Sequence, residues 1–160
     1  FLQQISALTA GALLADLPVA PLQASPVATK PVANAKLSIK ESLKFGMIEE
    51  KLSVMDKFKL LADLKFDGVE LDSPNDLDEK EILRAQDKTG LAIPGTVCST
   101  HWKNTLSDPD PAVREVTVKA MIKALEDTKK YGGNTVLLVP AVVNDKVGYD
   151  QAWERCTAEI

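Results

Sequence analysis

The chain has 160 residues, of which 45% are hydrophobic and 26% charged, and this is the balance of a globular domain of ordinary size. Its formal net charge is -4, and the basic residues do not cluster. Nucleic acid is therefore not expected as the main partner, because binding phosphate groups requires a concentrated basic surface. Two cysteines are too few for a disulfide scaffold.

Residues 1–24 differ in composition from the rest of the chain. Asp16 is their only charged residue, and residues 5–17 form an apolar, alanine-rich run, as in an export signal that is cleaved after Ala24. The Phe-Leu pair at the start resembles the end of the twin-arginine signal pattern. The run is too short for a transmembrane helix, so no stable membrane insertion is expected after signal removal. The sequence thus predicts a periplasmic or otherwise extracytoplasmic protein, with a disordered tail as the alternative for this segment.

The next residues predict a linker followed by the first structural unit. Residues 25–42 are rich in Pro and small residues without an apolar period, which is typical of a flexible linker. The globular part is expected over residues 43–160. Within it, residues 44–48 form a short apolar run that predicts the first strand. Ser53 is a good N-cap residue, and apolar residues at helical spacing predict a helix from there to Leu64.

The second and third units follow the same order of strand and helix. Residues 69–72 predict a strand, and residues 76–90 predict a helix that Asp76 caps and Gly90 ends. The third strand is expected over residues 91–97, an apolar stretch rich in β-branched residues. A long polar loop then leads to the next helix.

The last part of the chain predicts two more helices with a strand between them. Acidic residues and prolines at positions 108–111 favour a helix start, and apolar residues continue the helix to Tyr131. Residues 135–139 are continuously apolar, which is typical of a strand buried on both sides in a parallel sheet. A fourth helix is expected from Tyr149.

Four successive strand and helix units indicate an α/β fold with a parallel sheet and right-handed crossovers. Two architectures fit this order: an open doubly wound sheet, or the N-terminal half of an eight-stranded (β/α)8 TIM barrel. No glycine-rich phosphate-binding motif follows any predicted strand, which disfavours a nucleotide-binding open sheet.

Four strings of residues together resemble the sugar phosphate isomerase/epimerase family of the xylose isomerase-like TIM barrel superfamily, which also contains the endonuclease IV type of DNA-repair enzyme. The strings lie at residues 66–71, 98–102, 106–114 and 132–140, and the resemblance covers residues 43–160. In that family a divalent metal lies at the carboxyl-terminal mouth of the barrel, held by Glu, Asp, His and Glu at the ends of strands five to eight. The resemblance implies no metal ligand within this chain and ligands beyond residue 160.

The resemblance and the barrel geometry imply three candidate site residues near the mouth. His101, the only histidine, is the candidate catalytic residue, because a neutral imidazole can bind a sugar hydroxyl or assist its deprotonation. Trp102 is a candidate substrate-binding residue that offers an apolar platform to a sugar ring, and Glu70 is a second, which resembles the strand-two acid of the family. The alternatives are a loop histidine that caps a backbone carbonyl, a tryptophan that covers the barrel rim and a glutamate in a salt bridge. Asp72 is expected to be solvated.

The sequence therefore predicts a sugar isomerase/epimerase-like protein that uses metal-assisted proton transfer next to a sugar carbonyl. Its expected partner is a small-molecule sugar, and unpaired strand edges make self-association a further expectation. Two alternatives stay open. One is a non-catalytic half-barrel, as a truncated product or a subunit that completes itself by pairing. The other is a metal-dependent phosphodiesterase of the endonuclease IV type, which the single histidine and the acidic charge disfavour.

Overall fold

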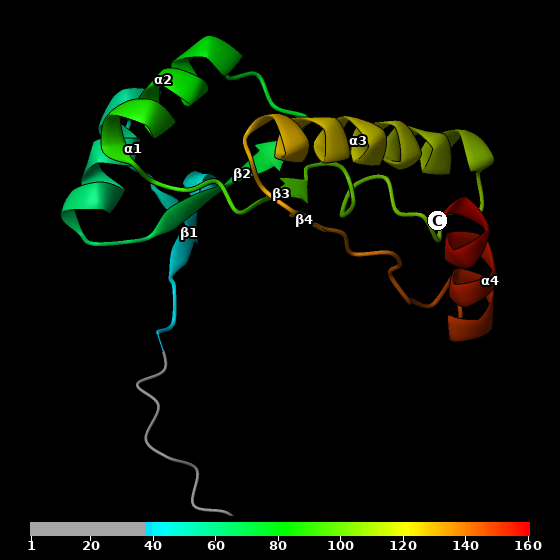
Figure 1. Ribbon diagram of the computed structural model, residues 1–160. Coiled ribbons are helices and arrows are strands. Elements are labelled where there is room, and N and C mark those ends of the chain that lie inside the picture. The colour runs from blue at the N-terminus through cyan, green and yellow to red at the C-terminus, as the bar shows by residue number, and fades with distance from the viewer. Residues whose placement is uncertain (1–37) are drawn as a thin grey trace, which may run out of the picture. The chain divides into compact units, whose positions relative to one another are not determined.

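The computed structural model describes residues 38–160 (Figure 1). The predicted export segment and residues 25–37 of the predicted linker lie outside the described residues. The predicted alternation of parallel strands and helices is confirmed, and the sheet order is β1-β2-β3-β4. The strands are β1 (Ser42–Lys44), β2 (Gly68–Ser73), β3 (Gly95–Cys98) and β4 (Thr135–Leu137). The helices are the short 3-10 helix η1 (Phe45–Met47), α1 (Val54–Asp63), α2 (Glu79–Thr89), α3 (Pro111–Lys130) and α4 (Tyr149–Glu159).

Local capping interactions set the start and end of the helices. The Ser53 side chain accepts a hydrogen bond from the Asp56 amide at the start of α1, as predicted. The cap of α2 is Asp78 and not the predicted Asp76. Helix α2 ends at Gly90, whose φ of 72° is a left-handed conformation that glycine adopts without strain. Asp110 caps α3 just before a proline at its first turn.

The first, third and fourth predicted strands differ from the observed ones. The fourth was expected over residues 135–139 and buried on both sides, but β4 ends at Leu137, and its residues Thr135 and Leu137 are exposed. The first was expected over residues 44–48, but β1 ends at Lys44 and the chain turns into η1. The Phe45 ring packs against the Phe58 ring of α1, with a centroid distance of 6.3 Å. This apolar contact holds the turn in place. The third strand pairs fully only from Gly95, because Pro94 has no amide hydrogen to offer the ladder.

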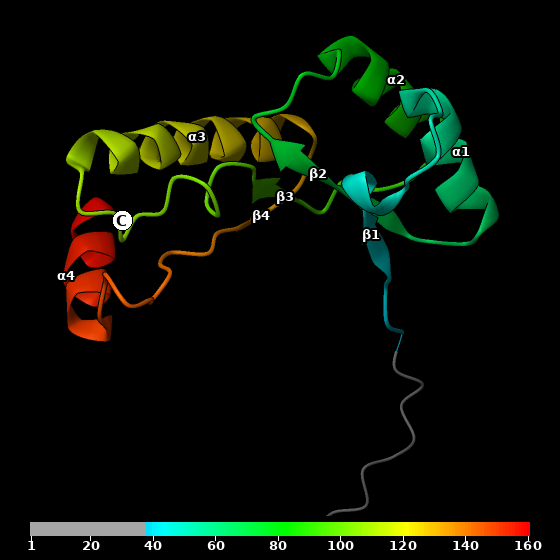
Figure 2. The same cartoon turned by 180° about the vertical axis from the view of Figure 1, so that it is seen from behind.

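Side chains of β2 alternate between the two faces of the sheet, and this alternation positions the candidate site. Val69 and Leu71 are fully buried in the apolar core that the sheet forms with α1 and α2. The Ser73 hydroxyl donates a hydrogen bond of 2.7 Å to Asp127 of α3. Figures 1 and 2 show α1, α2 and α3 on one side of the sheet. The intervening residues of β2 therefore point to the opposite side, which we call the inner face.

Helix α3 buries a narrower stripe than its sequence predicts. Its buried residues are Thr117, Ala120, Ala124, Asp127 and Thr128. Val116 and Leu125, two of the apolar residues from which this helix is predicted, are 44% and 56% exposed. Leu125 lies with Leu106 and Leu138 along an apolar hollow of about 210 Å³. Within residues 38–160 no helix is both long and apolar enough to cross a bilayer.

Candidate active site

His101 joins the loops that follow two neighbouring strands. It lies in the loop after β3, and its Nδ1 atom accepts a hydrogen bond of 3.2 Å from the backbone amide of Val139, just past β4. The side chain is almost completely buried, with 2% of the residue exposed. The expected alternative, a histidine that caps a backbone carbonyl, does not describe this contact, because here the ring is the acceptor.

The contact with Val139 determines which nitrogen of His101 carries the proton. A backbone amide only donates, so Nδ1 is unprotonated and the neutral ring carries its proton on Nε2. Burial lowers the pKa of His101, the charge of Lys44 lowers it further, and the charge of Asp72 opposes the shift. The imidazole is therefore neutral at pH 7, and Nε2 is a hydrogen-bond donor.

The free energy of unfolding should fall as the pH drops below 6.5, the ordinary pKa of the imidazole. Because the folded state holds the pKa of His101 below that value, the unfolded chain takes up a proton first and gains stability from it. The loss begins near 6.5 and levels off below the folded-state pKa. Urea unfolding at a series of pH values measures this slope. A His101→Asn variant should lose the slope, since the chain has no other histidine; an unchanged slope would contradict the assignment.

Trp102 stands next to the buried histidine and faces solvent. The edge-to-face arrangement of the two rings has a centroid distance of 5.3 Å and an interplanar angle of 88°. The tryptophan residue is 69% exposed. An exposed aromatic face beside a hydrogen-bond donor is a surface on which the apolar side of a sugar ring can pack.

Lys44 and Asp72 form an ion pair on the inner face, at the carboxyl ends of β1 and β2. The Lys44 Nζ lies 2.8 Å from Asp72 Oδ1, and the two side chains are 38% and 35% exposed. A Cβ atom on Gly46 would lie 3.5 Å from Asp72 Oδ2, so the backbone of η1 passes close to the carboxylate. The expectation that Asp72 is simply solvated is therefore wrong. The period-two pattern of β2, in which Asp72 follows the buried Leu71, is the sequence signal that places it on the inner face.

Glu70 lies on the inner face, but farther from the carboxyl ends of the strands than predicted. It is in the middle of β2, and its Oε1 accepts a hydrogen bond of 3.1 Å from the Ser42 hydroxyl. It lines a hollow of about 420 Å³ with residues near the amino ends of the strands, among them Gly68 and Pro94. The structure brings His101 and Trp102 together at the mouth, with the charges of Lys44 and Asp72 acting on the histidine. Glu70 does not join them, and its substrate-binding role stays a prediction.

The described residues do not fit a divalent metal ion. Across residues 38–160 no three side chains of His, Cys, Asp or Glu come together as a metal site would require. The Asp72 carboxylate is engaged by Lys44, and the Nδ1 atom of His101 is engaged by Val139.

Comparisons with known proteins agree with this architecture. The family model described as xylose isomerase-like TIM barrel matches residues 58–160. No curated protein matches the sequence. Among solved structures, the 3-keto-D-glucoside 4-epimerase YcjR from E. coli, in its apo form, is similar with a TM-score of 0.61 and 15% identity. A D-psicose 3-epimerase in the presence of D-fructose is similar with a TM-score of 0.58 and 18% identity.

These two likenesses concern the fold. Each covers 76% of this chain, and the matched region is 49% of the first structure and 46% of the second, so the chain spans about half their length. The sequential strand order, with helices α1 to α3 on one side of the sheet, is that of the N-terminal half of a TIM barrel. A doubly wound sheet changes direction and carries helices on both faces, so that alternative is excluded.

Proposed function

This chain belongs to the xylose isomerase-like TIM barrel family, and from that premise we propose that it is a sugar isomerase/epimerase-like protein. Its residues 38–160 provide one wall of the sugar site. The observation that carries this proposal is the buried His101 side chain. Its ring proton is held on Nε2 because Nδ1 accepts the hydrogen bond from the Val139 amide. The two epimerase structures with the same fold support a sugar as the substrate class.

In this proposal His101 acts as a donor to an oxygen atom of the sugar. Removing a proton from a carbon beside a carbonyl places negative charge on the carbonyl oxygen, and a fixed N–H group directed at that oxygen stabilises the charge. Abstraction of a proton by Nε2 would require the other tautomer and the loss of the hydrogen bond to Val139. Trp102 packs against the ring, and the half-exposed pair of Lys44 and Asp72 supplies a donor and an acceptor for sugar hydroxyls.

The divalent metal expected from the family would polarise the sugar carbonyl when bound. We propose that its ligands lie outside residues 38–160.

We also propose an extracytoplasmic location, on the basis of the composition of residues 1–24. Sequencing the amino terminus of exported material tests that location, and a chain that still began at Phe1 would contradict cleavage.

The sugar proposal is tested by nuclear magnetic resonance of the His101 ring, whose signals are unique because the chain has one histidine. Adding D-fructose to the full chain should shift the signal of the Nε2 proton. D-glucitol, a polyol without a carbonyl group, should produce a smaller shift at the same concentration. A Trp102→Ala variant should need more D-fructose for the same shift. No change in the His101 signals at molar D-fructose would reject the proposal.

A non-catalytic sugar-binding half-barrel is the second candidate. It is favoured by the lack of a metal-ligand cluster among the described residues. Incubation with D-fructose in heavy water, with and without added Mn²⁺, separates the two candidates. A catalyst of proton transfer beside the carbonyl incorporates deuterium into the sugar, whereas a binding protein shifts the His101 signals and leaves the sugar unlabelled.

We further propose that the chain self-associates. In the described sheet, β1 and β4 are the two edge strands, and edges of parallel sheets can pair with further strands. The apolar residues Ile122, Leu125 and Leu137 are 55%, 56% and 51% exposed. Light scattering should give a mass above that of a monomer and rising with concentration. A Leu125→Lys variant should lower that mass and a Glu126→Gln variant should not; a monomer with a sharp, cooperative melt would contradict the expectation.

A further inference from the structure

The loop that carries His101 has a second attachment to the segment after β4. Ser107, which is 1% exposed, accepts a hydrogen bond of 3.0 Å from the Val142 amide and donates one of 3.2 Å to the Val142 carbonyl. The loop after β3 is thus joined to the segment after β4 at two points: at His101 through Val139 and at Ser107 through Val142.

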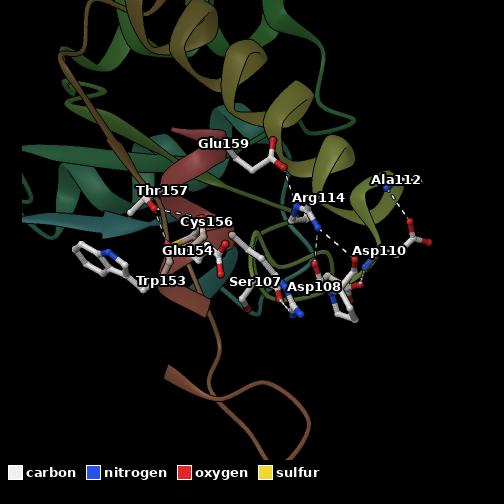
Figure 3. A network of polar contacts seen from close by, with 12 residues as sticks. Ser107, Asp108, Asp110, Ala112, Arg114, Trp153, Glu154, Cys156, Thr157 and Glu159 are labelled. Atoms are coloured by element: carbon white, nitrogen blue, oxygen red, sulfur yellow. Dashed lines mark hydrogen bonds and ion pairs between the residues drawn. The ribbon is translucent and has the colours of Figure 1, made fainter. Parts of the chain in front are cut away.

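Helix α4 also contacts the turn that contains Ser107. The Arg155 Nη1 atom donates a hydrogen bond of 3.0 Å to the Ser107 carbonyl. Next to it, Arg114 of α3 donates to the Asp108 carbonyl at 2.9 Å and forms an ion pair of 2.7 Å with Glu159 of α4. Figure 3 shows the turn at Ser107 and Asp108 close to Arg114 and to the residues of α4. The turn at Ser107 and Asp108 is therefore held by Arg155 of α4, in the following βα unit, and by Arg114 of α3, which is itself paired with α4.

We propose that Ser107 and Arg155 are positioning residues that hold His101 in the orientation in which Val139 binds Nδ1. If Ser107 releases Val142, the segment after β4 loses one of its two attachments, and the Val139 amide is free to move away from the ring. The chemical use of that orientation rests on the proposed function, whereas the coupling of the two loops does not.

A competing explanation is that α3 alone holds the loop. The buried Thr117 of α3 forms a hydrogen bond of 2.7 Å with the Thr100 hydroxyl and donates to the Asn104 carbonyl. One of these bonds lies just before His101 and the other between His101 and Ser107, and neither involves Ser107 or α4. If they suffice to orient His101, changes at Ser107 should leave the imidazole as it is.

A Ser107→Ala variant distinguishes the two explanations through two measurements on the full chain. The pKa of His101, followed by its ring signals, should move toward the ordinary value of the imidazole, because burial is the main cause of its lowered pKa and a ring released from Val139 is less completely buried. The charged groups that act on the ring, Lys44 and Asp72, are the same in the variant. Hydrogen exchange of the Val139 amide should accelerate by roughly fivefold, the factor that corresponds to losing one hydrogen bond. A Thr157→Ala variant is the control, since that hydroxyl binds only carbonyls within α4.

An Arg155→Met variant makes the inference testable even if Ser107→Ala fails to fold. Methionine keeps much of the apolar stem and removes the hydrogen bond to the Ser107 carbonyl. We expect a smaller shift of the His101 pKa and a smaller acceleration of Val139 amide exchange than in Ser107→Ala. A folded variant whose His101 titration and Val139 exchange equal those of the unaltered chain would overturn the inference. Neither measurement requires a sugar, so coupled loops without any response to D-fructose would reject the proposed function alone.

Discussion

A His101→Asn variant should stay folded and lose most of the proposed proton-transfer activity, whereas His101→Gln should lose stability as well. The asparagine side chain places its oxygen near the position of Nδ1, where it can accept the Val139 amide, but it has no group at the position of Nε2. The rate of deuterium exchange into the sugar should therefore fall by roughly 10²-fold, the cost of removing one donor to a developing oxyanion.

Glutamine makes the complementary change. Its amide reaches the position of Nε2 but leaves the Val139 amide without an acceptor, which should lower the free energy of unfolding by roughly 1–2 kcal/mol. Urea unfolding measures the stability of both variants, and exchange per folded molecule measures their chemistry. Equal exchange rates in both variants and the unaltered chain would show that His101 is a structural link between the loops and takes no part in the reaction.

A Gly95→Ala variant should be the most destabilising single methyl addition in the described sheet. A Cβ atom at Gly95 would lie 2.4 Å from Thr135 Oγ1 and 2.5 Å from the Thr135 carbonyl oxygen. Because one of these atoms belongs to the backbone, β3 and β4 must separate to admit the methyl group. The expected loss is about 3 kcal/mol of the free energy of unfolding, at the upper end of the usual cost of overpacking.

Gly148→Ala is the matched control for this variant. No atom lies within 4 Å of a Cβ placed at Gly148, and its φ of -71° is accessible to alanine. It should change stability by less than about 1 kcal/mol. Thermal melts of both variants make the comparison, and equal melting temperatures would show that the strands tolerate the wider spacing. Since His101 reaches from the loop after β3 to the segment after β4, the Gly95 variant should also loosen that contact.

The order of the strands and helices was predictable because it depends on local signals. The cap at Ser53 and the left-handed Gly90 are each determined by a few neighbouring residues, and both occur as expected. The first strand was predicted too late, because the hydrophobicity of Phe45 serves its contact with Phe58 and not a place in the sheet. An apolar run by itself does not distinguish these two uses.

The candidate site was predictable only in part because its contacts join separate strands. His101 was selected from the sequence, but the amide that binds its Nδ1 atom lies 38 positions away in the chain. The pairing of Lys44 with Asp72 depends on the register of β1 and β2, which places Lys44 opposite Glu70. Glu70 was placed near the mouth through the family resemblance, but it lies in the middle of β2, which continues to Ser73. Registers and strand ends are properties of the assembled sheet.

The ion pair of Lys44 and Asp72 also bears on how a ligand reaches the mouth. The two charges cancel at 2.8 Å, and the neighbouring imidazole is neutral, so these three side chains together present almost no net field to an approaching molecule. Association of an uncharged sugar should then be limited by diffusion and orientation, and its rate should hardly depend on ionic strength. A phosphorylated sugar would gain no electrostatic steering from this group.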